Sequence, residues 1–202
     1  MFWQAMGIGL AIAAPVGPIG LLCISRTMRG GPLLGLATGL GAASADGLFA
    51  LAGVCGGSLV LAWAGALARP LAWGGCLLLA WLGVATLRRP AGAGEGEDGE
   101  RRLARAYLGT LALTLSNPMT ILSFAAVAAG LSGGLPAGPA RQLEIVAGVF
   151  CGSALWWLLL AYGGGALLSR LGPAGRRGLD IACGLVLLGF AVGLGARAAG
   201  LA

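Results

Sequence analysis

GLATGLGAASADGLFALAG, residues 35–53, is the stretch that decides the fold class of this chain. It lies inside an apolar run, residues 34–64, in which Asp46 is the only charged residue. An α-helix rises about 1.5 Å per residue, so roughly 20 residues cross the apolar core of a bilayer, which is about 30 Å thick. This run is therefore long enough to form a membrane-spanning helix.

Similar runs recur along the whole chain, which has 202 residues. The candidate spans are residues 2–24, 34–64, 70–87, 106–129, 143–168 and 179–199. Hydrophobic residues make up 58% of the sequence and charged residues 10%, against roughly 25% charged residues in a typical soluble domain. The sequence therefore predicts an all-α integral membrane protein with six transmembrane helices, and it excludes an ordinary soluble domain.

The positive charges indicate the orientation, because cytoplasmic loops of membrane proteins carry an excess of Lys and Arg. With six spans, the loops on one side hold ten arginines: Arg26, Arg29, Arg88, Arg89, Arg101, Arg102, Arg105, Arg170, Arg176 and Arg177. The other side holds three: Arg69, Arg141 and Arg197. We therefore expect both termini to face outward. Because the arginines that give the net charge of +6 lie between the apolar runs, membrane topology explains them, and no nucleic-acid partner is expected.

Residues 88–105 form a charged, Gly-rich linker that divides the chain into two halves, residues 1–87 and 106–202. Each half holds three spans, so the second half must lie upside down relative to the first. This is the plan of an inverted repeat, which is common in secondary transporters. A proline-broken first helix and a second helix with glycines four residues apart recur in both halves.

Asp46 is the most informative side chain, since it is the only acidic residue in the middle of a span. An ionised carboxylate there costs at least ~2.5 kcal/mol on insertion scales, so it should face protein or water. It is a candidate site for a proton or a cation. The alternative is a structural carboxyl group that is kept protonated or is satisfied by a neighbouring helix.

Two helix breaks are expected at a similar depth. Pro15, Gly17 and Pro18 interrupt the first span, and Ser116, Asn117 and Pro118 interrupt the fourth. Broken helices at membrane depth expose N–H groups and dipole ends that receive charged substrate groups. We expect both breaks and Asp46 to converge on one cavity, although each break is also explicable as a packing kink.

Other polar and aromatic residues carry weaker signals. Trp156 and Trp157 lie in the middle of the fifth span, and two roles are left open for them, lining a cavity or packing between helices. Asp180 and Glu144 lie at span ends, so no chemistry is assigned to them. The chain has no histidine and five cysteines without a CxxC pair, and no cofactor is expected.

These motifs together resemble the LysE/RhtB family of amino acid exporters. APVGPIGLLCISRTMRGG, residues 14–31, the stretch at residues 35–53, and LTLSNPMTILSFAAVAAGL, residues 113–131, are similar to that family's first, second and fourth helices. One difference is that many members read Pro-Gly-Pro where this chain reads Pro-Val-Gly-Pro. By motif, the resemblance carries over the roles of Pro15, Gly17, Pro18, Asp46, Asn117 and Pro118.

The resemblance implies a transporter rather than an enzyme. Its expected activity is efflux of an amino acid or a similar small metabolite through the bacterial inner membrane, driven by the proton gradient. The expected partners are that substrate and the lipid bilayer, with a homodimer left open.

Two other functions remain as alternatives. One is a small cation or metal exporter of the same fold, for which the absence of His is unfavourable. The other is a membrane thiol oxidoreductase of the DsbD/CcdA type, which needs a cysteine in the fourth span where this chain has none.

Overall fold

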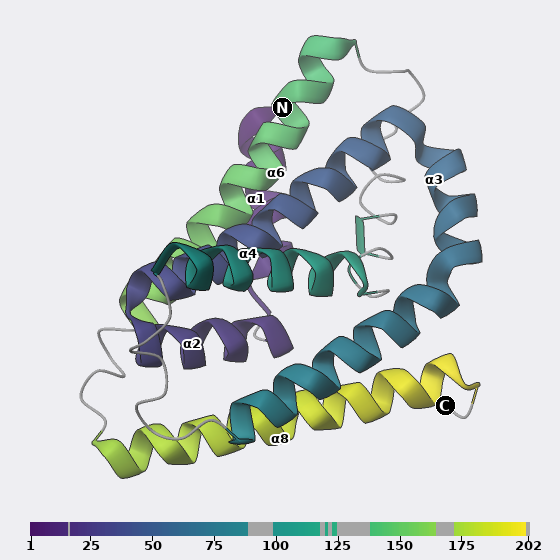
Figure 1. Cartoon of the computed structure of the whole chain (residues 1–202). Coiled ribbons are helices and arrows are strands. Elements are labelled where there is room, and N and C mark those ends of the chain that lie inside the picture. The colour runs from purple at the N-terminus through teal and green to yellow at the C-terminus, as the bar shows by residue number, and fades with distance from the viewer. Residues whose placement is uncertain are drawn as a thin grey trace.

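The computed structural model describes residues 1–15, 17–88, 99–117, 120, 123–124, 138–164 and 172–200, without the side chains of 56–68, 173 and 176. The described residues form helices and no strand, as Figure 1 shows. The helices are α1 (Phe2–Ala13), α2 (Pro18–Gly30), α3 (Pro32–Arg88), α4 (Gly99–Leu115), α6 (Pro139–Leu159), a π-helical turn η1 (Leu160–Gly164) and α8 (Pro173–Ala198). The prediction of an all-helical protein is confirmed.

Helix α3 contacts most of the other described helices. It is 57 residues long, and Figure 1 shows that it bends back on itself, so that it has two arms. The first arm, Pro32–Cys55, and the second, Arg69–Arg88, are each long and apolar enough to cross a membrane. The spans predicted from the sequence leave residues 65–69 between them as a connection, but this segment is helical. Leu and Ala, which dominate the segment before Pro70, are strong helix formers, and a helix tolerates a bend at proline.

Within the described residues, four helical segments meet the length and hydropathy of a membrane span, and a fifth is added if α1 and α2 are counted as one broken span. The predicted span at residues 106–129 begins within α4 and continues beyond the described residues. The number six therefore stays a prediction. The linker predicted at residues 88–105 is helical from Gly99 onward, where α4 begins.

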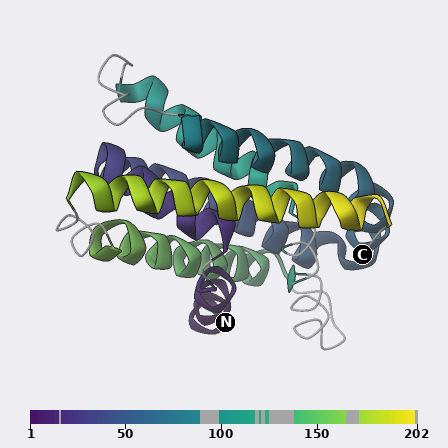
Figure 2. The same cartoon turned by 90° about the horizontal axis from the view of Figure 1, so that it is seen from below.

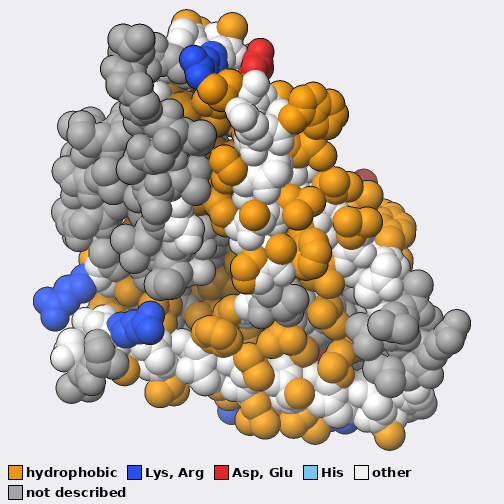
Figure 3. Space-filling view, turned by 180° about the vertical axis from the view of Figure 1, so that it is seen from behind, with side chains coloured by type: hydrophobic (Ala, Val, Ile, Leu, Met, Phe, Trp, Pro, Cys, Tyr) orange, Lys and Arg blue, Asp and Glu red, His pale blue; other side chains and the backbone are white. Residues whose placement is uncertain are grey.

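The surface of the helices fits a lipid environment. Leu77, Leu143 and Val192 are 68%, 70% and 72% exposed, and none of them lies at the end of the chain. Figure 3 shows one face on which hydrophobic side chains predominate, while its visible charged groups lie toward the edges. Large apolar patches of this kind mark membrane or protein contacts. The chain is a multi-pass membrane protein.

The remaining helices pack on the two arms of α3. Helix α8 lies along the second arm, as Figures 1 and 2 both show, and α4 and α6 pack against α3 as well. Helix α1 packs closely on α6. A Cβ atom on Gly9 would overlap the backbone of Val149, and one on Gly152 would overlap the backbone of Met6. Small residues of this kind let membrane helices approach closely.

This contact gives a first prediction about stability. Gly9→Ala is expected to lower the melting temperature in detergent, because its methyl group displaces backbone atoms of α6 and overpacking typically costs about 1–3 kcal/mol. Gly7→Ala on the same helix is the matched control, since its Cβ would meet nothing within 4 Å. Equal melting temperatures for the two variants would show that α1 and α6 are not in this contact.

Candidate functional site

The first helix break lies between α1 and α2. Helices α1 and α2 meet at 81°, so the predicted first span is two helices. Gly17 is the N-cap of α2, with extended backbone (φ −102°, ψ −161°), and Pro18 occupies the first turn. No side chain caps this end of α2. The first-turn N–H groups of a helix have no acceptor within the helix, so this end carries partial positive charge.

The second break follows α4, which ends at Leu115. Ser116 and Asn117 leave the helix, with the N–H of Asn117 bonded to the carbonyl of Thr114 at 3.1 Å. The carbonyl ends of a helix carry partial negative charge. The third residue of the predicted motif, Pro118, lies outside the described residues.

Both breaks line one cavity of about 670 Å³, which we call the break cavity. Gly17 and Pro18 contribute from the start of α2, and Ser116 and Asn117 from the end of α4. The rest of the wall comes mainly from the second arm of α3 and from α8: Ile19, Gly75, Leu79, Leu113, Val186, Gly189, Phe190, Gly193, Leu194 and Arg197. Its volume is typical of a small-molecule site.

Asp46 is not among the described residues that line this cavity. It lies on the first arm of α3 and is 4% exposed. The hydroxyl of Ser153 on α6 donates a hydrogen bond of 2.6 Å to its Oδ2. The indole N–H of Trp157, one turn further along α6, donates to the same hydroxyl oxygen at 3.2 Å. A carboxylate, a hydroxyl and an indole therefore form one buried chain of hydrogen bonds.

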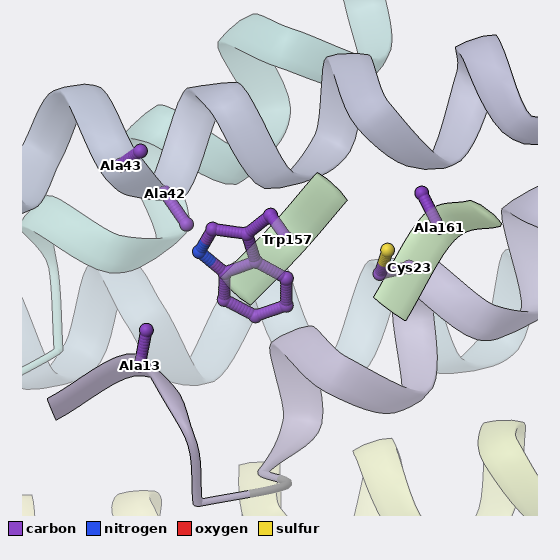
Figure 4. Packing of buried hydrophobic residues seen from close by; sticks show 6 residues of the cluster. All are labelled: Ala13, Cys23, Ala42, Ala43, Trp157 and Ala161. Atoms are coloured by element: carbon purple, nitrogen blue, oxygen red, sulfur yellow. The ribbon is translucent and has the colours of Figure 1, made fainter. Parts of the chain in front are cut away.

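Trp157 also belongs to a buried apolar cluster. Figure 4 shows its ring among small residues of four elements, Ala13, Cys23, Ala42, Ala43 and Ala161. Trp156 and Ile19 pack against this cluster from outside. Ile19 also lines the break cavity, so its side chain contacts both the cavity and the Trp157 cluster. Trp157 is a packed residue, and its polar atom faces Ser153.

Sequence reasoning missed a second buried polar group. Asp180 on α8 is 8% exposed, and its Oδ1 accepts hydrogen bonds of 2.9 Å from the hydroxyl of Ser25 and from Nε of Arg29. The guanidinium also forms an ion pair with the second carboxylate oxygen at 2.8 Å. The pair ties α2 to α8. In the sequence, the only sign of this pair is that Asp180 begins an apolar run on the side of the membrane that is predicted to carry most of the arginines.

The two arginines of the predicted first loop lie in a helix instead. Helix α2 continues to Gly30 and ends at Gly31, whose φ of +81° favours glycine. Arg26 is part-buried and donates from Nη1 to Thr38 Oγ1, Thr110 Oγ1 and the carbonyl of Ala106, each at 3.1 Å. Arg26 therefore joins α2, α3 and α4.

Comparison with known proteins adds one match. A family model described as LysE type translocator matches residues 10–197, which is nearly the whole chain. No curated protein and no solved structure matches the chain at a significant level.

Proposed function

The chain belongs to the LysE type translocator family, and from that premise we propose that it is a secondary transporter that exports an amino acid or a related small metabolite across the bacterial inner membrane. Membership implies membrane transport of amino acids or related compounds. The observation that carries the proposal is that two helix breaks, far apart in the sequence, line one cavity.

The two breaks offer opposite charges to a substrate. The start of α2 at Pro18 presents the positive end of a helix, and the end of α4 at Ser116 presents the negative end. A zwitterionic amino acid fits this arrangement, with its carboxylate at α2 and its ammonium at the carbonyl end of α4. In this proposal Gly17, Ser116 and Asn117 bind the substrate, while Pro15, Pro18 and Pro118 keep the two helices broken.

Asp46 is the proposed proton-binding group of an antiport mechanism. It is buried and accepts a hydrogen bond from Ser153, so gain or loss of a proton changes the charge inside the bundle. From the sequence, Asp46 was expected to bind a proton or a cation in the same cavity as the two breaks. In this proposal Asp46 acts on the break cavity indirectly, and the hydrogen bonds through Ser153 to Trp157 and the apolar cluster that Ile19 contacts support such a path.

Everted membrane vesicles test the function directly. A panel of radiolabelled amino acids is offered with and without a proton gradient, and at least one is expected to accumulate only with the gradient. Asn117→Ala is expected to reduce that uptake, whereas Gly7→Ala, which is remote from the cavity lining, should not. If no amino acid of the panel accumulates more with the gradient than without it, proton-coupled amino acid export is rejected.

The proposed topology is six spans in two inverted halves with both termini outside. A reporter fused within the linker at residues 89–98 is expected to score cytoplasmic, and reporters at either terminus to score periplasmic, because ten of thirteen arginines fall on the linker side. A cytoplasmic C-terminus would reject six spans and the inverted repeat together.

A further inference from the structure

A second cavity, of about 470 Å³, lies between α2, the second arm of α3 and α4. We call it the arginine cavity, because its described lining includes Arg26, Arg29, Arg101 and Arg105 and no carboxylate. Arg29 is paired with Asp180 on the neighbouring helix α8. Four guanidinium groups around one hollow favour an anionic occupant.

The arginine cavity and the break cavity follow one another along the same three helices. On α2 the break cavity has residues 17–19 and the arginine cavity has residues 22–29. On α3 the order is residues 75–79 and then 81–86, and on α4 it is residues 113–117 against 101–109. All three helices therefore place the two cavities end to end in one line.

Leucine side chains in the walls of the two cavities belong to one buried cluster. Leu22, Leu79, Leu82 and Leu113 are each between 3% and 5% exposed and belong to one buried cluster, which we call the leucine layer. Leu79 and Leu113 face the break cavity, while Leu22 and Leu82 face the arginine cavity. The leucine layer thus has two of its side chains in the wall of each cavity.

We propose that the two cavities are the opposite ends of one translocation route, that the leucine layer is its closed gate, and that the arginine cavity is the entry site for the substrate's carboxylate. This inference rests on the proposed export function. An apolar constriction of this kind closes a route by excluding water and ions. The predicted orientation places the arginine cavity on the cytoplasmic side, from which an exporter takes its substrate.

The charges of the two cavities differ in a way that supports this direction of travel. The arginine cavity has four arginines in its described lining, of which Arg29 is paired with Asp180, whereas the break cavity has Arg197 and helix ends of both signs. The substrate's carboxylate is thus first attracted into the arginine cavity by charge. Once the leucine layer opens, the substrate binds between the two helix ends of the break cavity. The layer consists of four leucines, so their rearrangement opens the route in this proposal.

Sidedness of cysteine labelling tests the route without a known substrate. Gly109 lines the arginine cavity and Gly193 the break cavity, and a Cβ at either would meet nothing within 4 Å. With the native cysteines replaced, Gly109→Cys and Gly193→Cys are treated with a membrane-impermeant methanethiosulfonate from one side at a time. Each is expected to react from one side only, and the two from opposite sides. Reaction of both from the same side, or of neither, overturns the proposal.

The gate is tested in the same background. Adding Leu82→Ala with Leu113→Ala is expected to let the reagent reach Gly109→Cys from both sides, because the layer loses its apolar bulk. Leu185→Ala with Val192→Ala, at exposed positions outside the layer, is the matched control and should keep the reaction one-sided. Size-exclusion chromatography selects folded preparations. If the folded Leu82→Ala, Leu113→Ala variant is still labelled from one side only, the leucines are not the gate.

Electrostatic preference tests the entry site. The ratio of rates for anionic sulfonatoethyl over cationic trimethylammonioethyl methanethiosulfonate is expected to be at least about tenfold higher at Gly109→Cys than at Gly193→Cys. Arg101→Gln with Arg105→Gln should remove most of that difference. Equal ratios at the two positions overturn the carboxylate site.

A lipid headgroup is the competing occupant of the arginine cavity. If phosphatidylglycerol vesicles slow labelling of Gly109→Cys relative to phosphatidylcholine vesicles, and the two Arg→Gln changes abolish the effect, the site holds lipid and the proposal fails. The two levels of inference also fail separately. Opposite sidedness without amino acid transport rejects the proposed function, whereas gradient-driven transport with same-side labelling rejects only this route.

Discussion

Replacement of Asp46 by asparagine is expected to abolish proton-driven efflux while the protein stays inserted and folded. Asparagine keeps the shape of the side chain and an oxygen that can accept the hydrogen bond of Ser153. It cannot gain or lose a proton, so the cycle loses its coupling step. Exchange of substrate down its own gradient is expected to survive, because the break cavity is intact. The measurement compares efflux with exchange in vesicles, using the amino acid selected by the panel.

Ser153→Ala is the companion variant. It removes the hydroxyl that bonds Oδ2 of Asp46 and accepts the indole N–H of Trp157, but it leaves the carboxyl group able to bind a proton. Efflux should therefore persist with a shifted pH profile. Wild-type efflux in Asp46→Asn would return Asp46 to a purely structural role.

Loss of the Asp180 carboxylate is expected to have the largest effect on stability. Asp180→Leu leaves the part-buried guanidinium of Arg29 without its ion-pair partner, and removing one member of a buried pair typically costs about 3 kcal/mol. For a domain of this size that corresponds to a fall of roughly 6–12 °C in melting temperature. Thermal unfolding in detergent measures it.

Two controls separate the ion pair from general damage. Arg29→Met combined with Asp180→Leu removes both charges and is expected to recover most of the loss, since an apolar pair of similar size often replaces a buried ion pair. Glu144→Leu changes an exposed carboxylate that lies 3.8 Å from the N-terminal amine and should leave the melting temperature nearly unchanged. Equal effects of Asp180→Leu and Glu144→Leu would contradict the assignment.

Local features of the fold were predictable from the sequence. Pro15 and Pro18 lie three residues apart in an apolar run, so a break there follows from lost N–H groups and steric clash. The burial of Asp46 follows from its place in the centre of an apolar segment. The close approach at Gly152 follows from glycine spacing on one helix face. In each case the physical cause lies within one helix.

Long-range partners were not predictable. Ser153 is 107 residues from Asp46 and Asp180 is 151 residues from Arg29, and no local periodicity encodes such pairs. The connection between the two arms of α3 was predicted as a loop, but α3 is one continuous helix with a proline inside it. A single proline near good helix formers bends a helix without ending it. Asp46 was expected in the same cavity as the two breaks, but similar depth in the membrane does not determine the side from which a residue faces a cavity.

The contact between α1 and α6 also bears on how the protein is made. Helix α1 docks through Gly9 on Val149 of α6, and Asp46 receives its hydrogen bond from Ser153 of the same helix, which is synthesised later than α3. At about 5–20 residues per second, synthesis of the 107 residues from Asp46 to Ser153 takes roughly 5–21 seconds. During that time the first arm of α3 enters the bilayer without this donor for its carboxylate. The nascent chain therefore depends on the insertion machinery, or on a bound proton, to hold Asp46 until α6 arrives.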